Sequence, residues 1–377
     1  MRKRYQAAAL ALGSLLMAGG FAGYRYVRRE RQEQLHYERA ETEVILSNTT
    51  SSSVELFRAD RSPREAVELP VPPDRRVWLP EGRYFFRANH APGPVFYPVP
   101  VLGYRSGPDR EGDIDITVRP LPPRRPPRLL PELPDFVYIP SGPFVIGDRL
   151  NPREPHYVWL TGFFMSPCEV TNAEFREFLR DTGAPRTQAS ARMSPADSDY
   201  GRFGRPELPV TGVSWLEASA FCRWLTTRLG GNEWIFALPN DAEWEKAARG
   251  PDSFDYSLGM TISDAEIPLY NWKKNPDVPV TVVSCRDSGF QPNRYGLYHM
   301  SGNVAEWTQS VFRHYNRQAP YTDDDRNHDS TVGRRTVRGG SWYSATSAPL
   351  YVPYRDSFQP EHAASDVGFR IVARARP

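Results

Sequence analysis

The sequence has few cysteines and no excess of charge of either sign. Its 377 residues include three cysteines, Cys168, Cys222 and Cys285, which are far apart and odd in number. No zinc-type spacing and no disulfide framework can be read from them, so each is predicted to be a small buried apolar side chain rather than a reactive thiol. The 47 basic residues nearly balance the 45 acidic ones. Because no basic, aromatic-interleaved patch is present either, we expect no nucleic-acid partner.

Paired histidines and long helical periodicity are also missing. The seven histidines show no i, i+3 or i+4 spacing, which argues against a metal site carried on one helix. His314 and His328 lie beside three aspartates, where either a divalent-ion cluster or a plain exposed acidic loop would fit. The 37 prolines and 19 tyrosines favour short strands, turns and irregular loops over a helical bundle.

The first 40 residues predict a membrane-proximal segment. Basic residues at 2–4 precede a charge-free run from Gln6 to Tyr24. As a helix this run would span roughly 28 Å, close to the hydrocarbon thickness of a bilayer. We therefore expect residues 1–24 to form an uncleaved N-terminal transmembrane helix, with a cleaved signal peptide as the alternative. Residues 25–40 are expected to form a charged stalk.

Short strand-like runs fill residues 41–118. Apolar residues alternate at Ile114, Ile116 and Val118, and Pro-Glu-Gly at 80–82 predicts a turn. The pattern predicts a small antiparallel β-sandwich, which looks like surface modules of the PEGA or carboxypeptidase-regulatory type. Residues 119–134 contain seven prolines and are predicted to be a stiff spacer with polyproline II character. A role as a PxxP ligand is the alternative.

A large domain is predicted at residues 135–377. An alternating run at 136–148 predicts a hairpin that turns at Ser141 and Gly142. Three helices are predicted from capping boxes, in which Ser, Thr or Asn precedes Glu by three positions. The boxes are Thr171/Glu174, Ser214/Glu217 and Asn240/Glu243, and glycines at 230 and 250 predict the ends of the second and third helices.

One stretch organises this domain, and it reads NRYGLYHMSGNVAEW from Asn293 to Trp307. Two glycines in it predict tight turns of the backbone. Glu306 is its only formal charge after Arg294. A single carboxylate among turn carbonyls suits a hard cation such as Ca²⁺. The alternative is a buried structural turn in which Glu306 caps backbone N–H groups or pairs with an arginine, for which Arg338 and Arg370 are the candidates.

The stretch resembles the signature of the formylglycine-generating enzyme (sulfatase-modifying factor) family. Further blocks similar to that family follow in order: FVYIPSGPFVIGD at 136–148, FFMSPCEVTNAEFREFL at 163–179, PVTGVSWLEASAFCRWL at 209–225, LPNDAEWEKAARG at 238–250, VRGGSW at 337–342 and VGFRIV at 367–372. The resemblance covers the chain from Asp135 to its end. It implies a loop-rich α+β fold related to C-type lectins, preceded here by the small all-β sandwich and the transmembrane helix.

The resemblance also implies where chemistry would lie. Two family cysteines after a Gly-Gly-Ser-aromatic motif bind Cu(I) and engage the substrate thiol, because soft thiolates select that ion. Ser344 stands at the first position, and Pro349 or Tyr351 lies near the second. Their hard oxygens cannot replace a thiolate pair, so copper is not expected as a cofactor. The candidate cleft for another chemistry consists of Ser341, Trp342, Ser344, Tyr351 and Arg355.

Calcium is the cofactor that the resemblance leaves open. Carried over residue by residue, one family calcium site falls on His299, Gly302, Val304 and Glu306, with His299 in place of the family's asparagine. A second site would involve Asn271 and Trp272, ahead of a loosely similar loop at 287–290. Both sites would use main-chain and side-chain oxygens.

These features predict a membrane-anchored protein of the bacterial envelope whose large domain lies outside the cytoplasm, in the periplasm or at the cell surface. The domain is predicted to be a non-catalytic binding or scaffolding module for a protein, peptide or glycan. One alternative is a metal-dependent or otherwise oxidative enzyme with a reshaped active site. Another is a lectin-like binder in which Trp342, Tyr343 and Tyr351 stack on sugar rings.

Overall fold

The computed structural model of the chain describes only part of its sequence. The described residues are 41–50, 52–59, 66–91, 93–101, 114–148, 155–184, 193–194, 196, 200–262, 282–285, 287, 289–313 and 333–376. The predicted membrane segment, the stalk and the stretch with His314 and His328 lie outside these residues. Within them, no helix combines the length and the apolar character that crossing a bilayer requires.

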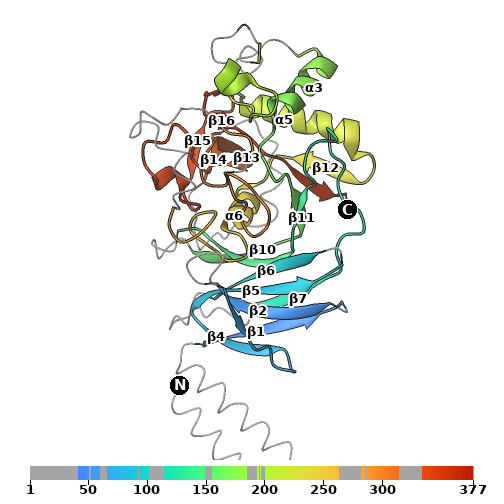
Figure 1. The fold of residues 1–377 in the computed structure, drawn as a ribbon, viewed down its shortest axis with the longest axis vertical. Coiled ribbons are helices and arrows are strands. Elements are labelled where there is room, and N and C mark those ends of the chain that lie inside the picture. Colours follow the sequence, from blue (N-terminus) through green and yellow to red (C-terminus); the bar gives the residue numbers. More distant parts are fainter. Residues whose placement is uncertain are drawn as a thin grey trace, which may run out of the picture.

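Two sheets that face each other form the N-terminal part of the structure (Figure 1). One has the order β4-β1-β7 and the other the order β3-β2-β5-β6. The strands are β1 (Glu41–Asn48), β2 (Ser53–Arg58), β3 (Val67–Leu69), β4 (Arg76–Pro80), β5 (Gly82–Asn89), β6 (Pro94–Val101) and β7 (Ile114–Val118). The predicted sandwich is confirmed, with Ile114, Ile116 and Val118 buried between its sheets.

The expectation of a purely antiparallel sandwich is wrong in one pair. β7 lies parallel to β1, with Val44 opposite Ile114 and Asn48 opposite Val118. β7 follows β6, which belongs to the opposite sheet, so no tight turn imposes an antiparallel direction on it. The turn predicted at 80–82 does lie between two strands, because β4 ends at Pro80 and β5 begins at Gly82, in the other sheet.

The described residues of the large domain form three further sheets. Their orders are β10-β9, β12-β17-β11-β8 and β15-β14-β13-β16. The strands are β8 (Val137–Ile139), β9 (Gly142–Ile146), β10 (His156–Leu160), β11 (Phe163–Met165), β12 (Trp234–Ala237), β13 (Ala305–Val311), β14 (Arg335–Arg338), β15 (Asp356–Phe358), β16 (Val367–Gly368) and β17 (Val372–Ala375).

The predicted hairpin between β8 and β9 does not form. β8 pairs with β11 and β9 pairs with β10, so two consecutive strands enter different sheets. Gly142, with φ of 137°, lies at the junction in a conformation that other residues rarely adopt. The alternating sequence predicted both strands correctly, but the partner of each strand follows later in the chain.

All three predicted capping boxes are present. They begin α3 (Asn172–Thr182), α5 (Trp215–Leu225) and α6 (Asp241–Arg249). In each box the cap side chain accepts a hydrogen bond from the glutamate N–H, and the glutamate carboxylate accepts one from the cap N–H. α6 ends at Gly250 as predicted, whereas α5 continues through a π-helical turn, η3 (Thr226–Gly230), before its glycine. The described residues also include two short helical turns, η2 (Tyr200–Gly204) and η6 (Ala348–Leu350).

The proline-rich segment 119–134, which was predicted to be a stiff spacer, packs along the large domain. Pro126 is buried, and Leu129 packs against the main hydrophobic core of the domain. Arg124 forms an ion pair with Glu233, next to β12. The prolines do exclude regular structure, as predicted. The leucines between them, however, have apolar surface to bury on the domain.

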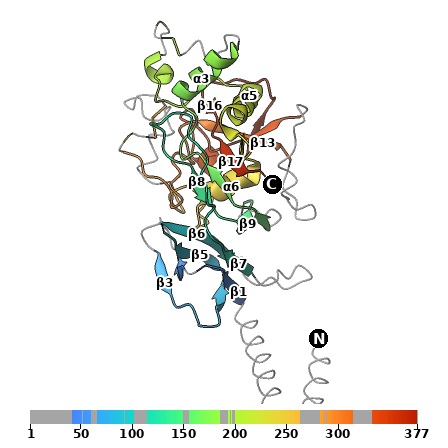
Figure 2. The same ribbon diagram turned by 90° about the vertical axis from the view of Figure 1, so that its right-hand side faces the viewer.

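The sandwich also contacts the large domain directly (Figure 2). Phe254 is buried against Phe85 of β5, and Arg83 of the same strand forms an ion pair with Asp255 at 3.3 Å. The guanidinium of Arg294 stacks over Phe85, with 4.5 Å to the ring centroid. These contacts connect the sandwich to the segment that follows α6, close to the polar network described below.

Candidate functional site

The organising stretch centres on a buried ion pair between Glu306 and Arg370. Glu306, on β13, is completely buried. Its Oε1 accepts a hydrogen bond from Nη2 of Arg370 and its Oε2 accepts one from Nε, both at 2.7 Å. Oε2 also accepts a bond from the indole N–H of Trp244 at 2.7 Å. Of the two arginines considered as partners, Arg370 is therefore confirmed and Arg338 is not.

Positive backbone angles shape the turn that precedes Glu306. Gly296 and Gly302 have φ of 97° and 114°, which confirms the tight turns predicted there. His299 and Asn303 also lie in the left-handed region, with φ of 58° and 65°. Asn293 fixes the start of the turn, because its side-chain amide donates to the carbonyl of residue 247 in α6 at 2.8 Å.

Two of the four residues of the first expected calcium site, Glu306 and His299, have side chains that already face other groups in this arrangement. Ca²⁺ takes six to eight oxygen ligands. Both carboxylate oxygens of Glu306 already accept bonds from a guanidinium. The imidazole of His299 faces Glu169. The second expected site, at Asn271 and Trp272, lies outside the described residues, so calcium binding stays a prediction.

A buried polar cluster beside this turn escaped the sequence analysis. Asn303 donates its amide to Oε1 of Glu169 at 2.9 Å, and Nδ1 of His299 lies 3.4 Å from Oε2 of the same carboxylate. All three side chains are buried, and Nε2 of His299 has no hydrogen-bond partner among the described residues. Glu169 lies 130 residues before His299, so no spacing in the sequence could have connected them.

The candidate cleft residues all belong to one loop, which we name the 341–355 loop. At its start the hydroxyl of Ser341 donates to Asp366 at 2.7 Å. The hydroxyl of Ser344 accepts a bond from the N–H of Ser341 at 3.0 Å. Trp342 is buried and packs against Phe203, with 5.5 Å between the ring centroids. The two serines therefore hold a turn that carries Trp342 into the domain.

The end of the same loop has different partners. The phenol of Tyr351 donates to Oδ1 of Asp148 at 2.7 Å, and Nη2 of Arg355 lies 2.5 Å from Oδ2 of Asp241. Burial and then the bond to Asp148 raise the pKa of Tyr351, so the phenol stays protonated. The structure thus divides the five predicted residues into a serine group and a Tyr351–Arg355 group.

A glycine keeps the two groups of the loop close together. Gly340 has φ of 67°, and a Cβ added to it would lie 2.8 Å from the backbone carbon of Pro349. Such an approach is closer than van der Waals contact permits, so only glycine fits there. The start of the loop therefore touches the turn that leads to Tyr351.

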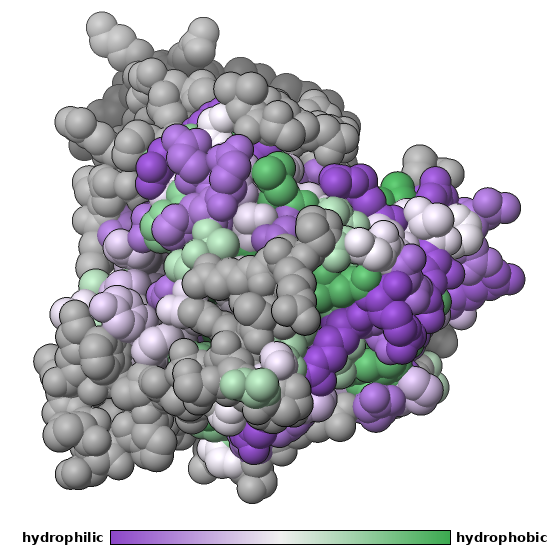
Figure 3. Space-filling model, turned by 90° about the horizontal axis from the view of Figure 1, so that it is seen from above, coloured by the Kyte–Doolittle hydropathy of each residue, from purple (hydrophilic) through white to green (hydrophobic). Residues whose placement is uncertain are grey.

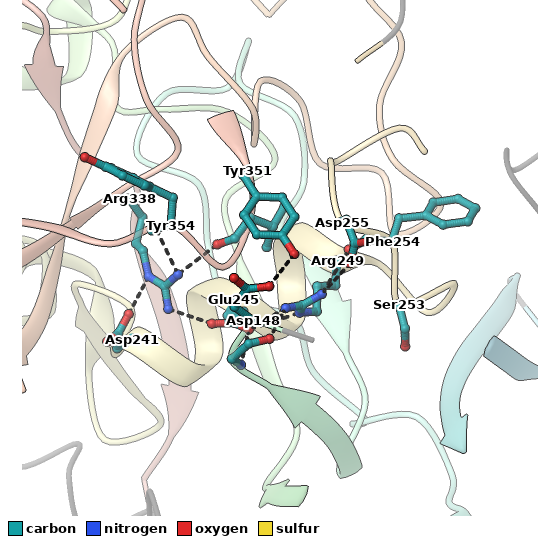
Figure 4. A network of polar contacts seen from close by, with 12 residues as sticks. Asp148, Asp241, Glu245, Arg249, Ser253, Phe254, Asp255, Arg338, Tyr351 and Tyr354 are labelled. Atoms are coloured by element: carbon teal, nitrogen blue, oxygen red, sulfur yellow. Dashed lines mark hydrogen bonds and ion pairs between the residues drawn. The ribbon is translucent and has the colours of Figure 1, made fainter. Parts of the chain in front are cut away.

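Arg338 connects the loop to a network of buried charges (Figure 4). It donates to Asp241 at 2.5 Å and to Glu245 at 2.7 Å, and it also donates to the carbonyl of Val352 at 2.8 Å. Glu245 accepts a further bond from Arg249. Burial alone would raise the pKa of both carboxyls, but the neighbouring guanidinium groups outweigh it and lower the pKa of each.

Two of the three cysteines form a disulfide, which the sequence analysis did not predict. Cys168 and Cys285 are bonded across 117 residues of chain. Cys222 is buried in the main core as expected, and burial raises the pKa of its thiol to about 12. No cysteine follows residue 285 in the sequence. The 341–355 loop therefore has oxygen donors but no thiolate of its own, and it does not fit Cu(I).

Two tyrosines of the loop are exposed. Tyr343 keeps 48% of its surface exposed and Tyr354 keeps 40%. On the face seen in Figure 3, hydrophobic side chains lie in separate small areas between hydrophilic ones. The described part of this face therefore has no single broad apolar surface. Contacts by individual aromatic rings are the kind of binding that such a loop can make.

Comparison with known proteins agrees with the resemblance seen in the sequence. Residues 123–375 match the family model described as the sulfatase-modifying factor enzyme 1-like domain. The chain belongs to this family. The match begins inside the proline-rich segment, in keeping with the contacts that this segment makes to the domain. The described architecture is the mixed, strand-rich fold of formylglycine-generating enzymes.

The chain matches different fractions of the length of its individual relatives. The chain is 29% identical to a formylglycine-generating enzyme of Streptomyces coelicolor over 291 residues, which takes in 62% of this chain and 87% of the relative. It is 30% identical to the serine/threonine-protein kinase pkn1 of Chlamydia pneumoniae over 259 residues, 65% of this chain, but spans 38% of the kinase.

Among solved structures, the Treponema denticola variable protein 1 has a TM-score of 0.51 and 25% identity. The match covers 64% of this chain and 95% of that protein. Nearly all of that protein thus has the fold of this family.

We predict that Arg338→Ala destabilises the protein in a pH-dependent way. Removing one partner of a buried ion pair costs about 3–5 kcal/mol at neutral pH. With Arg338 present, the pKa values of Asp241 and Glu245 lie below their ordinary values of 3.8 and 4.5. The ion pairs therefore stabilise the protein fully at pH values above these ordinary values, and this stabilisation is lost as the pH falls below them. Without it, Arg249 still lies beside Glu245 and Arg355 beside Asp241, but they offset the burial of the two carboxyls less completely, so the pKa of each is higher than in the wild type. The difference in the free energy of unfolding between the wild type and Arg338→Ala should therefore become smaller as the pH falls toward about 4.

Chemical denaturation at several pH values measures this difference. Arg180→Ala is the matched control, because Arg180 is 67% exposed and pairs with Glu177 on the surface of α3. It should change the free energy of unfolding by less than about 1 kcal/mol. If Arg338→Ala lowers the free energy of unfolding only slightly, or lowers it more at low pH than at neutral pH, the network does not stabilise the protein as proposed.

We also predict that calcium does not stabilise the protein through Glu306, so that any rise in melting temperature at millimolar calcium is the same in Glu306→Gln. A ligand raises the melting temperature only if it binds the folded state, and the carboxylate of Glu306 is already bonded through both oxygens. Differential scanning fluorimetry with calcium, and with a chelator as control, measures the shift. A rise with calcium that Glu306→Gln abolishes would establish the expected calcium site.

Proposed function

We propose that the large domain is a binding module and that the 341–355 loop is its contact surface. It would recognise a protein, peptide or glycan without copper-dependent oxidation of a cysteine. The observation that carries this proposal is that the hydroxyl groups of the loop form hydrogen bonds within the domain. Ser341, Ser344 and Tyr351 each have a hydrogen-bond partner within the domain. They support the shape of the loop and leave no soft ligand for Cu(I).

The exposed aromatic side chains support binding at this loop. Tyr343 lies beside the buried Trp342, with 5.5 Å between the ring centroids, so one ring is anchored and its neighbour faces solvent. An aromatic ring on a fixed backbone loses little conformational entropy when a ligand stacks on it. Arg338 bonds the carbonyl of Tyr354 at 3.2 Å, which also fixes the backbone beneath the second exposed ring.

We further propose that the domain works in the bacterial envelope, anchored to the membrane by residues 1–24. The charge-free run of those residues and the disulfide between Cys168 and Cys285 support this location. Disulfides persist in oxidising compartments and are rare in the cytosol. The sandwich and the proline-rich segment both contact the large domain, so they would hold it at a defined position on the membrane side.

The oxidase test uses a peptide with the sulfatase-type motif Cys-x-Pro-x-Arg, supplied with copper and oxygen. We expect no aldehyde product by mass spectrometry and no stoichiometric Cu(I) bound to the purified protein, because the loop has no thiolate. The formylglycine-generating enzyme of Streptomyces coelicolor is the positive control. Oxidation of the peptide by this protein would refute the proposal.

The binding test screens the purified protein on arrays of glycans and of peptides. We expect Tyr343→Ala to weaken binding of any ligand found by about tenfold, the loss that corresponds to one stacked ring. Ile235→Ala is the matched control. Ile235 is also exposed, but it lies on β12 and not in the 341–355 loop. Equal loss in both variants, or no loss in Tyr343→Ala, would place the contact surface elsewhere.

A further inference from the structure

The turn that follows α6 lies between the sandwich and the 341–355 loop. It begins after Gly250 and ends at Gly259, which exchanges main-chain hydrogen bonds with Tyr256 in both directions. We name residues 251–259 the α6 turn. Most of its side chains are buried. Because a buried turn cannot turn its main-chain polar groups to water, each of them needs a partner in the protein.

Three consecutive carbonyls of the α6 turn are bonded to three different parts of the molecule. They belong to residues 253, 254 and 255, and their donors are, in that order, Nε of Arg83 at 2.9 Å, Nη1 of Arg249 at 3.3 Å and the main-chain N–H of Val352 at 2.9 Å. Arg83 belongs to the sandwich, Arg249 to α6 and Val352 to the 341–355 loop. The sandwich and the loop therefore complete the hydrogen bonding of the same turn.

Side chains of the α6 turn also face both neighbours. Phe254 keeps 1% of its surface exposed and packs against Phe85 of the sandwich. Tyr256 lies beside Tyr351 of the loop, with 5.7 Å between the ring centroids. Figure 4 shows Phe254 pointing away from Tyr351. The turn thus contacts the sandwich with one ring and the loop with another.

The end of the 341–355 loop is fixed from this side. The N–H of Val352 donates to the carbonyl of Asp255, and its own carbonyl accepts a bond from Arg338 at 2.8 Å. Tyr354 follows, with its N–H bonded to the carbonyl of Tyr351 at 2.7 Å and its carbonyl bonded to Arg338. The backbone beneath the exposed ring of Tyr354 therefore continues directly from the residue that the α6 turn binds.

We propose that the sandwich regulates the contact surface by fixing the end of the 341–355 loop through the α6 turn. The inference rests on the proposed function, since it takes this loop as the contact surface. With the sandwich docked, the backbone at Tyr354 is ordered before a ligand arrives, which lowers the entropy that binding must offset. Displacement of the sandwich loosens this end and weakens the contact that Tyr354 makes. The other exposed ring, Tyr343, lies beyond this control.

The test is amide hydrogen exchange of the full chain, followed by mass spectrometry with fragmentation that resolves single residues. We expect Arg83→Ala and Phe254→Ala to accelerate exchange at Val352 by at least about tenfold, because each removes a contact between the sandwich and the α6 turn. The N–H of Trp342 should keep its rate, because it donates to the carbonyl of Asn303 at the other end of the loop. Arg83→Ala removes no buried ring, so the test stands even if Phe254→Ala does not fold.

Arg87→Ala is the matched control. Arg87 lies on the same strand as Arg83, but it pairs with Glu55 and stacks over Phe57, both within the sandwich. This variant should leave the exchange of Val352 unchanged. The N–H groups between β12 and β17 should keep their rates in all three variants.

Local acceleration at Val352 in Arg83→Ala or Phe254→Ala supports the proposal. Unchanged exchange at Val352 in both would show that the α6 turn holds the loop without the sandwich. Equal acceleration in Arg87→Ala, at Trp342 or between β12 and β17 would show a general loss of stability. Each of these latter results overturns the proposal. The readouts need no ligand, so they can succeed or fail independently of the array screen.

Discussion

The ion pair between Arg370 and Glu306 is the interaction on which the large domain depends. Besides Glu306, the guanidinium donates to the carbonyls of Tyr298 and Pro167. One side chain near the C-terminus therefore fixes β13, the turn before it and the segment before α3. A buried pair of this kind adds little net stability compared with apolar side chains of the same size. Its effect is specificity, because any other arrangement of these segments would leave a buried charge without a partner.

A second chain of charges extends that constraint toward the sandwich. From Arg338 it runs through Glu245 to Arg249, whose Nη1 lies 3.4 Å from Asp255. Asp255 also pairs with Arg83 of the sandwich. At the other end of this chain, Arg338 donates to the carbonyl of Val352 in the 341–355 loop. A continuous series of ion pairs and hydrogen bonds therefore runs from the sandwich, through α6, to the loop that we propose as the contact surface.

Local features of this fold could be predicted from the sequence, and long-range ones could not. The capping boxes were predictable because cap and glutamate lie three positions apart, within one helical turn. The turns at Gly296 and Gly302 were predictable because glycine marks backbone that other residues avoid. The partners of β8 and β9, the Cys168–Cys285 bond and the Glu169–Asn303 contact join residues far apart in the chain. Their formation depends on the packed tertiary structure, which no local pattern encodes.

The candidate loop uses oxygen groups in contacts that a cysteine could not replace. The hydroxyl of Ser344 accepts a bond from the N–H of Ser341, and sulfur is a weak acceptor. A thiol at position 344 would therefore weaken the turn that positions it. At the other end, the phenol of Tyr351 reaches Asp148, and a shorter cysteine side chain would leave that carboxylate without its donor. The oxygen groups of this loop are therefore part of its support, and the present shape of the loop depends on them.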